Sequence, residues 1–275
     1  MVSPNRKKHK TIKGILLIVI FFMALSPILF YSVSEVEVSD VEIANKPHYK
    51  KPEQPLHDVE LPDFLSIRHI PDRKQAFFEF LKPAIEKENQ RLNKLRHTIM
   101  LLAEQHQQGE TLSNQQVLWL TKLSKSYRVN PKWSIAEQLS ALLVKVDEIP
   151  RQLVLVQAAN ESAWGSSRFA KIGLNFFGIW CFKQGCGMVP NGRDAGLRHE
   201  VAAFDSVDDV IGHYFLNINS NAAYNMLRQI RAQLREHDVP LQADILATGL
   251  LPYSERGIDY VVEINTMLRH NRRYL

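Results

Sequence analysis

Cysteine is scarce in this sequence, and neither sign of charge dominates it. Cys181 and Cys186 are the only cysteines among the 275 residues. A structural zinc site needs about four ligands, and His199 and His213 are poor candidates for the missing two, so the cysteines do not predict a metal site. The formal net charge is +5, and no basic stripe alternates with aromatic residues, which argues against a nucleic-acid partner.

Long apolar runs are also rare, but one stands out near the N-terminus, over residues 14–33. At 1.5 Å per helical residue it is roughly 30 Å long, about the thickness of a bilayer core. Basic residues precede the run and acidic residues follow it, which predicts that the remainder of the chain is exported. We expect an uncleaved membrane anchor. A cleaved signal peptide is the alternative, although no A-x-A cleavage site follows.

The predicted export indicates a structural role for the two cysteines. In an oxidising compartment Cys181 and Cys186 are expected to form a disulfide. They lie in a glycine-rich stretch, residues 180–204, with a turn signal at Asn191-Gly192 and a strand-like run over residues 200–204. This stretch predicts a small β-lobe.

The chain divides into four predicted regions: residues 1–33 with the basic flank and apolar run, 34–72 as a proline-rich spacer, 73–146 as a helical N-terminal region, and 147–275 as the main domain. Proline fixes φ and removes a hydrogen-bond donor, so the spacer is expected to be extended. The alternative is that part of it packs on the domain through Phe64, Leu65 and Ile67.

Helical periodicity begins near residue 72 and continues almost to the C-terminus, so the expected fold class is mainly α with a small β-lobe (α+β). Pro83 is expected to bend or restart the first helix. Side-chain capping pairs mark two further helix starts: Ser134 with Glu137, and Ser206 with Asp209.

The most informative residue is Glu161, at the end of a helix that is apolar nearly all round and therefore buried. Gln157, Asn160 and Trp164 share its face. Burial, the apolar wall of Trp164 and the helix C-terminus should all raise the pKa of Glu161, which predicts a proton donor. The alternative is a glutamate that is exposed or held in a hydrogen-bond network.

Two motifs then resemble a known family. The first is Glu161-Ser162-x-Trp164-Gly165, and the second is Asn175-Phe176-Phe177-Gly178-Ile179. Together they resemble the glucosaminidase domain of bacterial peptidoglycan hydrolases, which includes the flagellar rod-associated autolysins. The resemblance covers about residues 142–275.

The resemblance implies a lysozyme-like fold, in which a helical lobe and a small β-lobe enclose a groove. The family cleaves the β-1,4 bond after N-acetylglucosamine in cell-wall glycan strands, and Glu161 matches its general acid. The other residues that match family positions are Ser162 against the groove floor, Trp164 and Gly165 in the turn after the helix, and Asn175, Phe177 and Gly178 in the groove wall. Trp180 would present an aromatic face to sugar rings; the alternative is a core residue.

A tyrosine near the last helix also reaches the groove in this family, although the usual Tyr-Ala-Thr-Asp pattern is absent here. Tyr253 and Tyr260 are both possible matches. We expect Tyr253 to lie in the groove, and Tyr260 to be a core residue with its hydroxyl at the surface.

The second catalytic carboxylate is less well marked by the sequence. Glycoside hydrolysis normally uses two, and the family places the second one in the β-lobe. Glu200 is the favoured candidate because it precedes the strand-like run and could point into the groove; Asp194 and Asp205 are alternatives. An enzyme with a single acid is also possible, since lytic transglycosylases share the Glu-Ser signature.

The resemblance therefore implies a glycosidase that acts on peptidoglycan glycan strands and needs no metal or organic cofactor. The apolar run at residues 14–33 predicts that this enzyme is exported to the periplasm and held at the inner membrane. Two alternatives are a lytic transglycosylase and a non-catalytic wall-binding module with a decayed site.

Overall fold

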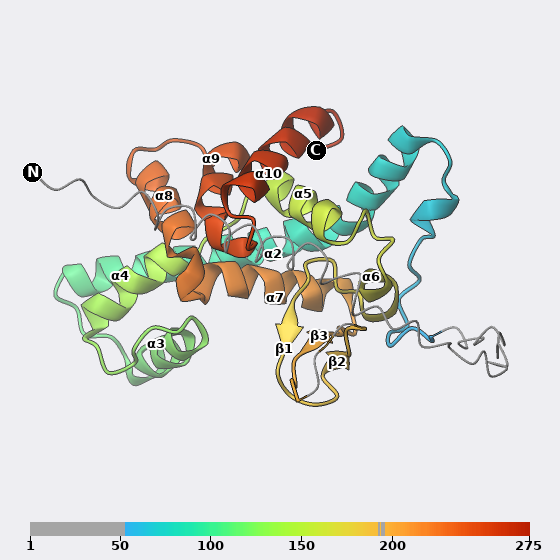
Figure 1. Cartoon of the computed structure of the whole chain (residues 1–275). Helices are drawn as coiled ribbons and strands as arrows, with labels where there is room; N and C mark the ends of the chain where they lie inside the picture. Colours follow the sequence, from blue (N-terminus) through green and yellow to red (C-terminus); the bar gives the residue numbers. More distant parts are fainter. Residues whose placement is uncertain (1–52, 192, 194–195) are drawn as a thin grey trace, which may run out of the picture. The chain divides into compact units, whose positions relative to one another are not determined.

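The computed structural model describes residues 53–191, 193 and 196–275 (Figure 1). Pro52–Leu275 form one compact unit, so the predicted regions 73–146 and 147–275 share one structure. The apolar run at residues 14–33 and the first part of the predicted spacer lie outside the described residues. Within the described ranges, none of the helices is long and apolar enough to cross a membrane.

The longest helix is α2 (Ile70–Gln107), which packs against α4, α5 and α7. Its buried face follows the expected i, i+4 spacing, with Phe77, Phe78, Leu81 and Ile85 fully buried. The helix does not restart at Pro83, contrary to one form of the prediction. The packing of this apolar face outweighs the cost of about 3 kcal/mol that an interior proline carries.

Side-chain caps set the starts of several other helices. Ser113 and Gln116 form a capping box for α3 (Asn114–Ser126), and Ser134 and Glu137 form one for α4 (Ile135–Lys145). The Ser206 hydroxyl accepts a hydrogen bond from the Asp209 amide at the start of α7 (Val207–Ser220). The two pairs predicted from the sequence are therefore confirmed.

The central helix is α5 (Arg151–Glu161), with Pro150 at its N-cap. Its residues Leu153 to Val156, with Ala158 and Ala159, have no exposed surface. It contacts α2, α9 and α10, and this burial on all sides confirms the expectation from its apolar sequence.

The remaining helical segments close the helical part around α5. They are α6 (Arg168–Gly173), η2 (Ala222–Tyr224), α8 (Asn225–Glu236), α9 (Ala243–Ala247), η3 (Thr248–Tyr253) and α10 (Ile258–Asn271).

A small antiparallel sheet projects beside α6 and α7 (Figure 1). Its strands are β1 (Trp180–Cys181), β2 (Gly187–Met188) and β3 (Glu200–Ala202), in the order β1-β3-β2. Trp180 pairs with Val201, and Met188 pairs with the same residue from the other side. The expected disulfide joins Cys181 to Cys186 and closes the loop between β1 and β2. The structure is thus mainly helical with a small sheet, as predicted.

The described end of the predicted spacer packs on this unit. The Leu56 amide donates to the Ile172 carbonyl oxygen at 2.8 Å. Phe64, in η1 (Phe64–Ser66), is 2% exposed and meets Phe77 edge-on, whereas Leu65 is 51% exposed. The alternative of packing through Phe64 is therefore correct for this part of the chain.

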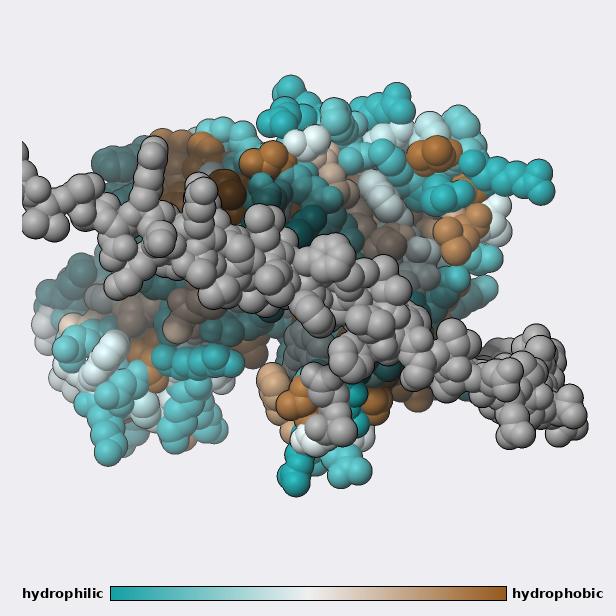
Figure 2. Space-filling model, in the orientation of Figure 1, coloured by the Kyte–Doolittle hydropathy of each residue, from teal (hydrophilic) through white to brown (hydrophobic). Residues whose placement is uncertain are grey.

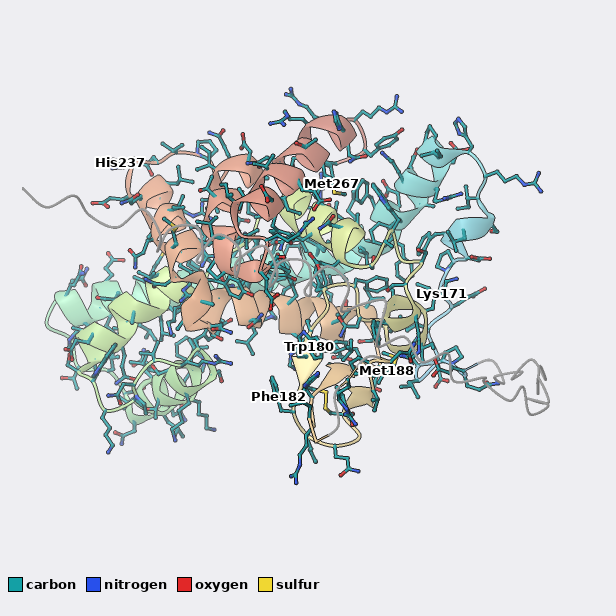
Figure 3. All side chains as sticks on the ribbon, viewed as in Figure 1. Lys171, Trp180, Phe182, Met188, His237 and Met267 are labelled. Carbon is teal, nitrogen blue, oxygen red and sulfur yellow. A yellow bond between two sulfur atoms is a disulfide. The ribbon has the colours of Figure 1, made fainter. Side chains whose placement is uncertain are left out.

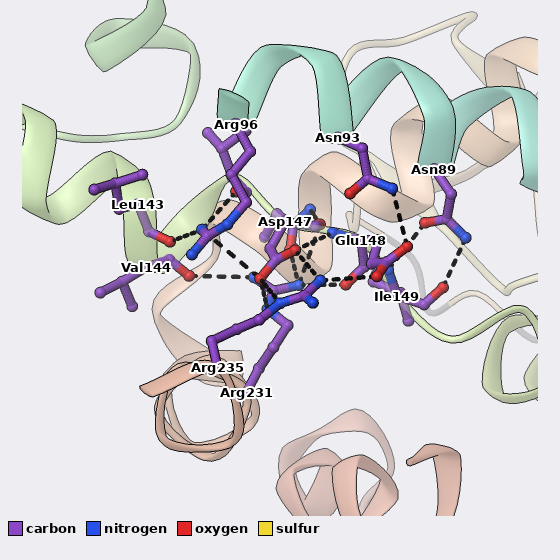
Figure 4. Close-up of polar contacts among 12 residues, drawn as sticks. Asn89, Asn93, Arg96, Leu143, Val144, Asp147, Glu148, Ile149, Arg231 and Arg235 are labelled. Carbon is purple, nitrogen blue, oxygen red and sulfur yellow. Dashed lines mark hydrogen bonds and ion pairs between the residues drawn. The ribbon is translucent and has the colours of Figure 1, made fainter. Parts of the chain in front are cut away.

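A buried ionic cluster joins α2, the α4–α5 connection and α8 (Figure 4). Both oxygens of the Asp147 carboxylate accept hydrogen bonds from Arg235, at 2.9 and 3.1 Å, and Arg96 lies 3.7 Å from one of them. Arg231, which has no exposed surface, donates to the Asp147 carbonyl oxygen and to Asn219. Hydrogen bonds and ion pairs thus connect α2, from the predicted N-terminal helical region, to the α4–α5 connection and to α8.

Candidate functional site

The end of α5 is fixed by an unusual turn. Ala163, Trp164 and Gly165 have φ values of 49°, 60° and 75°, three consecutive residues in the left-handed region. Glycine adopts this conformation without strain. For any other residue the left-handed conformation costs roughly 1–2 kcal/mol. The buried Ser162 hydroxyl holds the turn, since it donates to the Ala158 carbonyl oxygen and accepts from the Gly165 amide at 2.8 Å.

Gly165 is also required by space. A Cβ there would lie 2.7 Å from a Phe64 ring carbon, closer than side chains tolerate. Trp164 packs against Phe77 and Phe78, with the ammonium of Lys74 5.1 Å from its ring. The two motif residues therefore anchor the helix end to α2.

Glu161, the last residue of α5, is half-buried. Burial raises the pKa of its carboxyl, whereas hydrogen bonds from Tyr260 and Asn160 and the charge of Arg256 lower it, and the carboxylate of Glu263 raises it. Burial wins, so the pKa lies above its ordinary value of 4.5. This confirms the direction expected from the sequence, but the apolar wall is not supplied by Trp164, which faces α2.

Tyr260 belongs to a hydrogen-bond chain that ends at Glu161. The Tyr214 hydroxyl donates to the side-chain oxygen of Gln157, and the Gln157 amide donates to the Tyr260 hydroxyl oxygen at 2.9 Å. The Tyr260 proton is thereby directed to its hydrogen bond with Glu161. Burial raises the pKa of Tyr260, so this donor keeps its proton.

A tight loop after α6 approaches Glu161 from the sheet side. Asn175 is buried and holds the loop together: its amide donates to the carbonyl oxygens of Ile179 and Ala202, and its oxygen accepts from the Ile179 amide at 3.0 Å. Gly178 has a φ of 65°, and a Cβ there would lie 4.0 Å from Glu161 Oε2. Glycine therefore leaves the space next to the carboxyl open.

Gly178 also lines a groove of about 590 Å³ between α3 and the sheet, with α7 beneath it. Figure 2 shows the notch in the molecular outline between these two parts. The lining includes Phe177 and Tyr253 near Glu161, Trp180 and Phe182 on the sheet side, and Lys125, Ser126 and Arg128 at the end of α3. Trp180 and Phe182 lie at the edge of the sheet nearest α3 (Figure 3). Glu161 itself does not line this groove; its carboxyl lies next to Gly178, which does.

Glu161 itself lines a second, polar pocket of about 290 Å³. It is lined by Glu161, Asn160, Ser254, Arg256, Tyr260 and Glu263. Arg256 and Glu263 form an ion pair within it. A cation, a carboxylate and a tyrosine therefore surround the Glu161 carboxyl here.

Four of the predicted site residues line the groove: Phe177, Gly178, Trp180 and Tyr253. The Tyr253 hydroxyl donates to the Phe177 carbonyl oxygen at 3.0 Å, and its ring stacks on that of Tyr260. The prediction that the Tyr260 hydroxyl lies at the surface is wrong, because this residue is 1% exposed and forms hydrogen bonds with Gln157 and Glu161.

Three other predicted residues act behind the groove surface. Ser162 and Asn175 are buried and use their polar atoms on the backbone, while Trp164 packs on α2. None of them lines the groove or the polar pocket. Their position makes them residues that shape the site, and the expected contact of Ser162 with the groove floor is wrong.

Glu200 does not point into the groove, contrary to the expectation. It is 5% exposed, and its two oxygens accept hydrogen bonds from the amides of Gly185 and Gly187, each at 3.0 Å. These backbone donors lower its pKa, so the carboxylate is charged and holds the disulfide loop. Asp205 is exposed and lines neither pocket, and Asp194 lies outside the described residues.

Sequence reasoning missed that Arg256 and Glu263 line a pocket with Glu161, and it preferred Tyr253 to Tyr260 as the tyrosine near the acid. Tyr260 and Glu263 are three positions apart on α10 and so share a face, which is a signal that could have paired them. Arg256 precedes the helix in a turn, and nothing in its spacing indicates that it faces α5.

Cys181, Cys186 and Glu200 offer ligand atoms within 4.8 Å of one another. The two sulfurs are joined in the disulfide, so neither is a thiolate that could bind a metal ion. The Glu200 oxygens are also occupied by backbone amides. This donor set does not fit a metal.

Comparison with known proteins agrees with the two motifs. The family described as glucosaminidase, mannosyl-glycoprotein endo-beta-N-acetylglucosaminidase, matches residues 136–273. Protein bax of Escherichia coli (strain K12) is 30% identical over 237 residues, which cover 85% of this chain and 82% of that protein. No solved structure matches. On the first two findings, the chain belongs to the glucosaminidase family.

Proposed function

We propose that this protein is a peptidoglycan hydrolase that cleaves the β-1,4 bond after N-acetylglucosamine, with Glu161 as the general acid. Membership of the glucosaminidase family supports a glycosidase that acts on peptidoglycan. The observation that carries the proposal is the half-buried Glu161 carboxyl with a raised pKa, next to Gly178, which lines a groove with aromatic residues.

In the proposed reaction, the glycan strand lies in the groove and Glu161 protonates the oxygen of the leaving sugar. Positive charge develops at the sugar carbon as the bond breaks, and in the hydrolase a water molecule adds to this carbon and releases a proton. The carboxylate that remains receives the hydrogen bonds of Tyr260 and Asn160, which stabilise the charged form. The same groups that hold the carboxyl in place before proton transfer therefore accommodate the product anion.

The water-activating group is not Glu200 in this proposal, because both of its oxygens are bonded to the backbone. Among the described residues, Glu263 is the other carboxylate that lines a pocket with Glu161, and it is paired with Arg256. Because neither Glu200 nor Glu263 is an unpaired carboxylate, a second candidate function is favoured: a lytic transglycosylase, in which a single residue acts first as the acid and then as the base.

The products distinguish the two candidates. Purified sacculi digested by the full chain should release fragments with reducing N-acetylglucosamine ends, which mass spectrometry identifies. Fragments that carry only 1,6-anhydro ends would replace the hydrolase by a lytic transglycosylase. Binding to sacculi without any soluble product would instead identify a non-catalytic wall-binding module.

We further propose that the enzyme works in the periplasm, anchored at the inner membrane by residues 14–33. The disulfide between Cys181 and Cys186 supports export to an oxidising compartment. Fractionation of cells that express the full chain tests this: the protein should stay with the membranes after high-salt washing. A soluble form that starts after residue 33 would replace the anchor by a cleaved signal peptide.

A further inference from the structure

The end of α3 forms one wall of the groove, although it lies before the region that matches the family. Lys125, Ser126 and Arg128 line this wall, whereas the family match begins at residue 136. The predicted N-terminal helices therefore contribute surface to the site as well as support for its core.

The charge of this wall is unopposed within the groove. Lys125 and Arg128 are both exposed, and neither side chain has a hydrogen bond or ion pair with any residue that the structure describes. No aspartate or glutamate occurs among the described residues that line the groove. His213 on α7 is the other titratable basic residue in the lining. The groove is thus complementary to carboxylates.

The backbone at Arg128 is held in a conformation that favours glycine. Its φ is 55°, and the Val129 amide donates to the Ser124 carbonyl oxygen at 2.8 Å to close the helix end. The ammonium of Lys145 donates to the carbonyl oxygens of Tyr127 and Arg128 at 2.8 and 3.0 Å. A strained position occupied by a long cationic side chain in a groove points to a role in binding.

The opposite wall has a different character. Trp180 is 50% exposed and Phe182 is 79% exposed, and both line the groove from the sheet. Exposed aromatic rings are suited to contact the faces of sugar rings. A ligand that fills the groove would meet aromatic surface on one side and two cations on the other, which matches a sugar strand that carries carboxylates.

We propose that Lys125 and Arg128 form a specificity site for carboxylates borne by the glycan strand, so that this protein prefers a charged strand to an uncharged one. The inference rests on the proposed function and assigns the substrate class of the same groove. The carboxylate comes either from the acidic ether side chain of the sugar or from a peptide attached to it.

The test measures binding in a Glu161→Gln background, so that it does not depend on turnover. The groove variant is Lys125→Gln with Arg128→Gln. The matched control is Lys122→Gln with Lys132→Gln, which changes the net charge equally at two exposed residues outside the groove lining. Three ligands are compared: intact sacculus strands, strands from which the peptides have been removed, and uncharged N-acetylglucosamine oligomers.

At low salt we expect the groove variant to bind intact strands about ten-fold more weakly than the control variant. Both variants should bind the uncharged oligomers equally. Peptide removal breaks the amide bond to the ether side chain and so frees a carboxylate on the sugar. Loss of the difference after peptide removal therefore assigns the peptide carboxylates, and its persistence shows that the freed sugar carboxylate is recognised. Equal binding of the two variants to intact strands, or equal weakening of the groove variant towards all ligands, would overturn the inference.

Failure of the proposed function gives a different result. In that case the chain with native Glu161 releases no soluble fragments, whether or not the groove variant binds more weakly than its control.

Discussion

Burial raises the pKa of the Glu161 carboxyl, whereas the hydrogen bonds of Tyr260 and Asn160 and the charge of Arg256 lower it. The effect of burial is the largest, so the pKa is raised. A raised pKa in the folded state means that the carboxyl opposes folding increasingly as the pH rises above the ordinary value of 4.5, because the unfolded chain ionises more easily.

Glu161→Gln should therefore increase the free energy of unfolding at neutral pH, and this increase should vanish below about pH 4. Denaturant titrations at several pH values measure this difference. The exposed Glu255, changed to glutamine, is the control and should show no comparable increase. A stability gain that does not depend on pH would contradict the raised pKa.

The ion pair beside Glu161 gives a second prediction, with opposite signs for its two members. Arg256 lowers the pKa of Glu161 and Glu263 raises it. Because the protonated form is the proposed acid, activity falls as the pH rises through this pKa. Arg256→Gln should shift the basic limb of the pH profile upward, and Glu263→Gln should shift it downward. Shifts of the same sign in both variants would show that the pair acts by shape alone.

At the scale of single elements, the end of α3 combines strain with a binding role. Arg128→Gly removes the left-handed strain and should raise the free energy of unfolding by up to about 1 kcal/mol, while binding to sacculi weakens. Lys122→Gly, inside the same helix, should cost about 1 kcal/mol and leave binding unchanged. Thermal unfolding and sacculus pull-down measure the two effects, and unchanged binding by Arg128→Gly would contradict the assignment.

The elements also show where sequence reasoning succeeds. Ser134 with Glu137, and the apolar run that ends at Glu161, act over one or two turns of a helix, so their spacing is sufficient to predict them. Pro83 was less informative, because the local cost of a proline is overridden by packing of α2 against distant helices.

The partners of the candidate site were harder to predict, because they come from separate elements. The role of Glu200 depends on two amides of a loop whose shape is set by the disulfide and the sheet. Tyr253 and Tyr260 stack on each other, and which hydroxyl reaches Glu161 depends on Gln157 from α5. Neither arrangement has a local signature in the sequence.

At the scale of the whole molecule, the Asp147 cluster joins the predicted N-terminal helices to the rest (Figure 4). Burial raises the pKa of Asp147, but the hydrogen bond of Arg235 and the charges of Arg231 and Arg96 outweigh it, so the pKa lies below 3.8. Burial lowers the pKa of Arg231 to about 10, so this residue is charged at neutral pH.

Asp147→Asn should destabilise the protein by about 3–5 kcal/mol at neutral pH, because it leaves the buried Arg231 charge uncompensated. A carboxyl whose pKa is lowered in the folded state stabilises the fold above about pH 4. This stabilisation is lost as the pH falls through the folded-state pKa, so the difference in stability between the native protein and Asp147→Asn should shrink in acid. Urea unfolding at neutral and acidic pH checks both. A change below 1 kcal/mol would mean that the cluster does not hold α2 to α8.

The proton-donor role of Glu161 is tested most directly with purified sacculi. The full chain and its Glu161→Gln variant are incubated with the same material, and soluble fragments are quantified by mass spectrometry over the same time. Glutamine keeps the size of the side chain but cannot donate the proton, so the rate of release should fall at least about 100-fold while sacculus binding is retained. Equal rates of release from the two proteins would contradict the account.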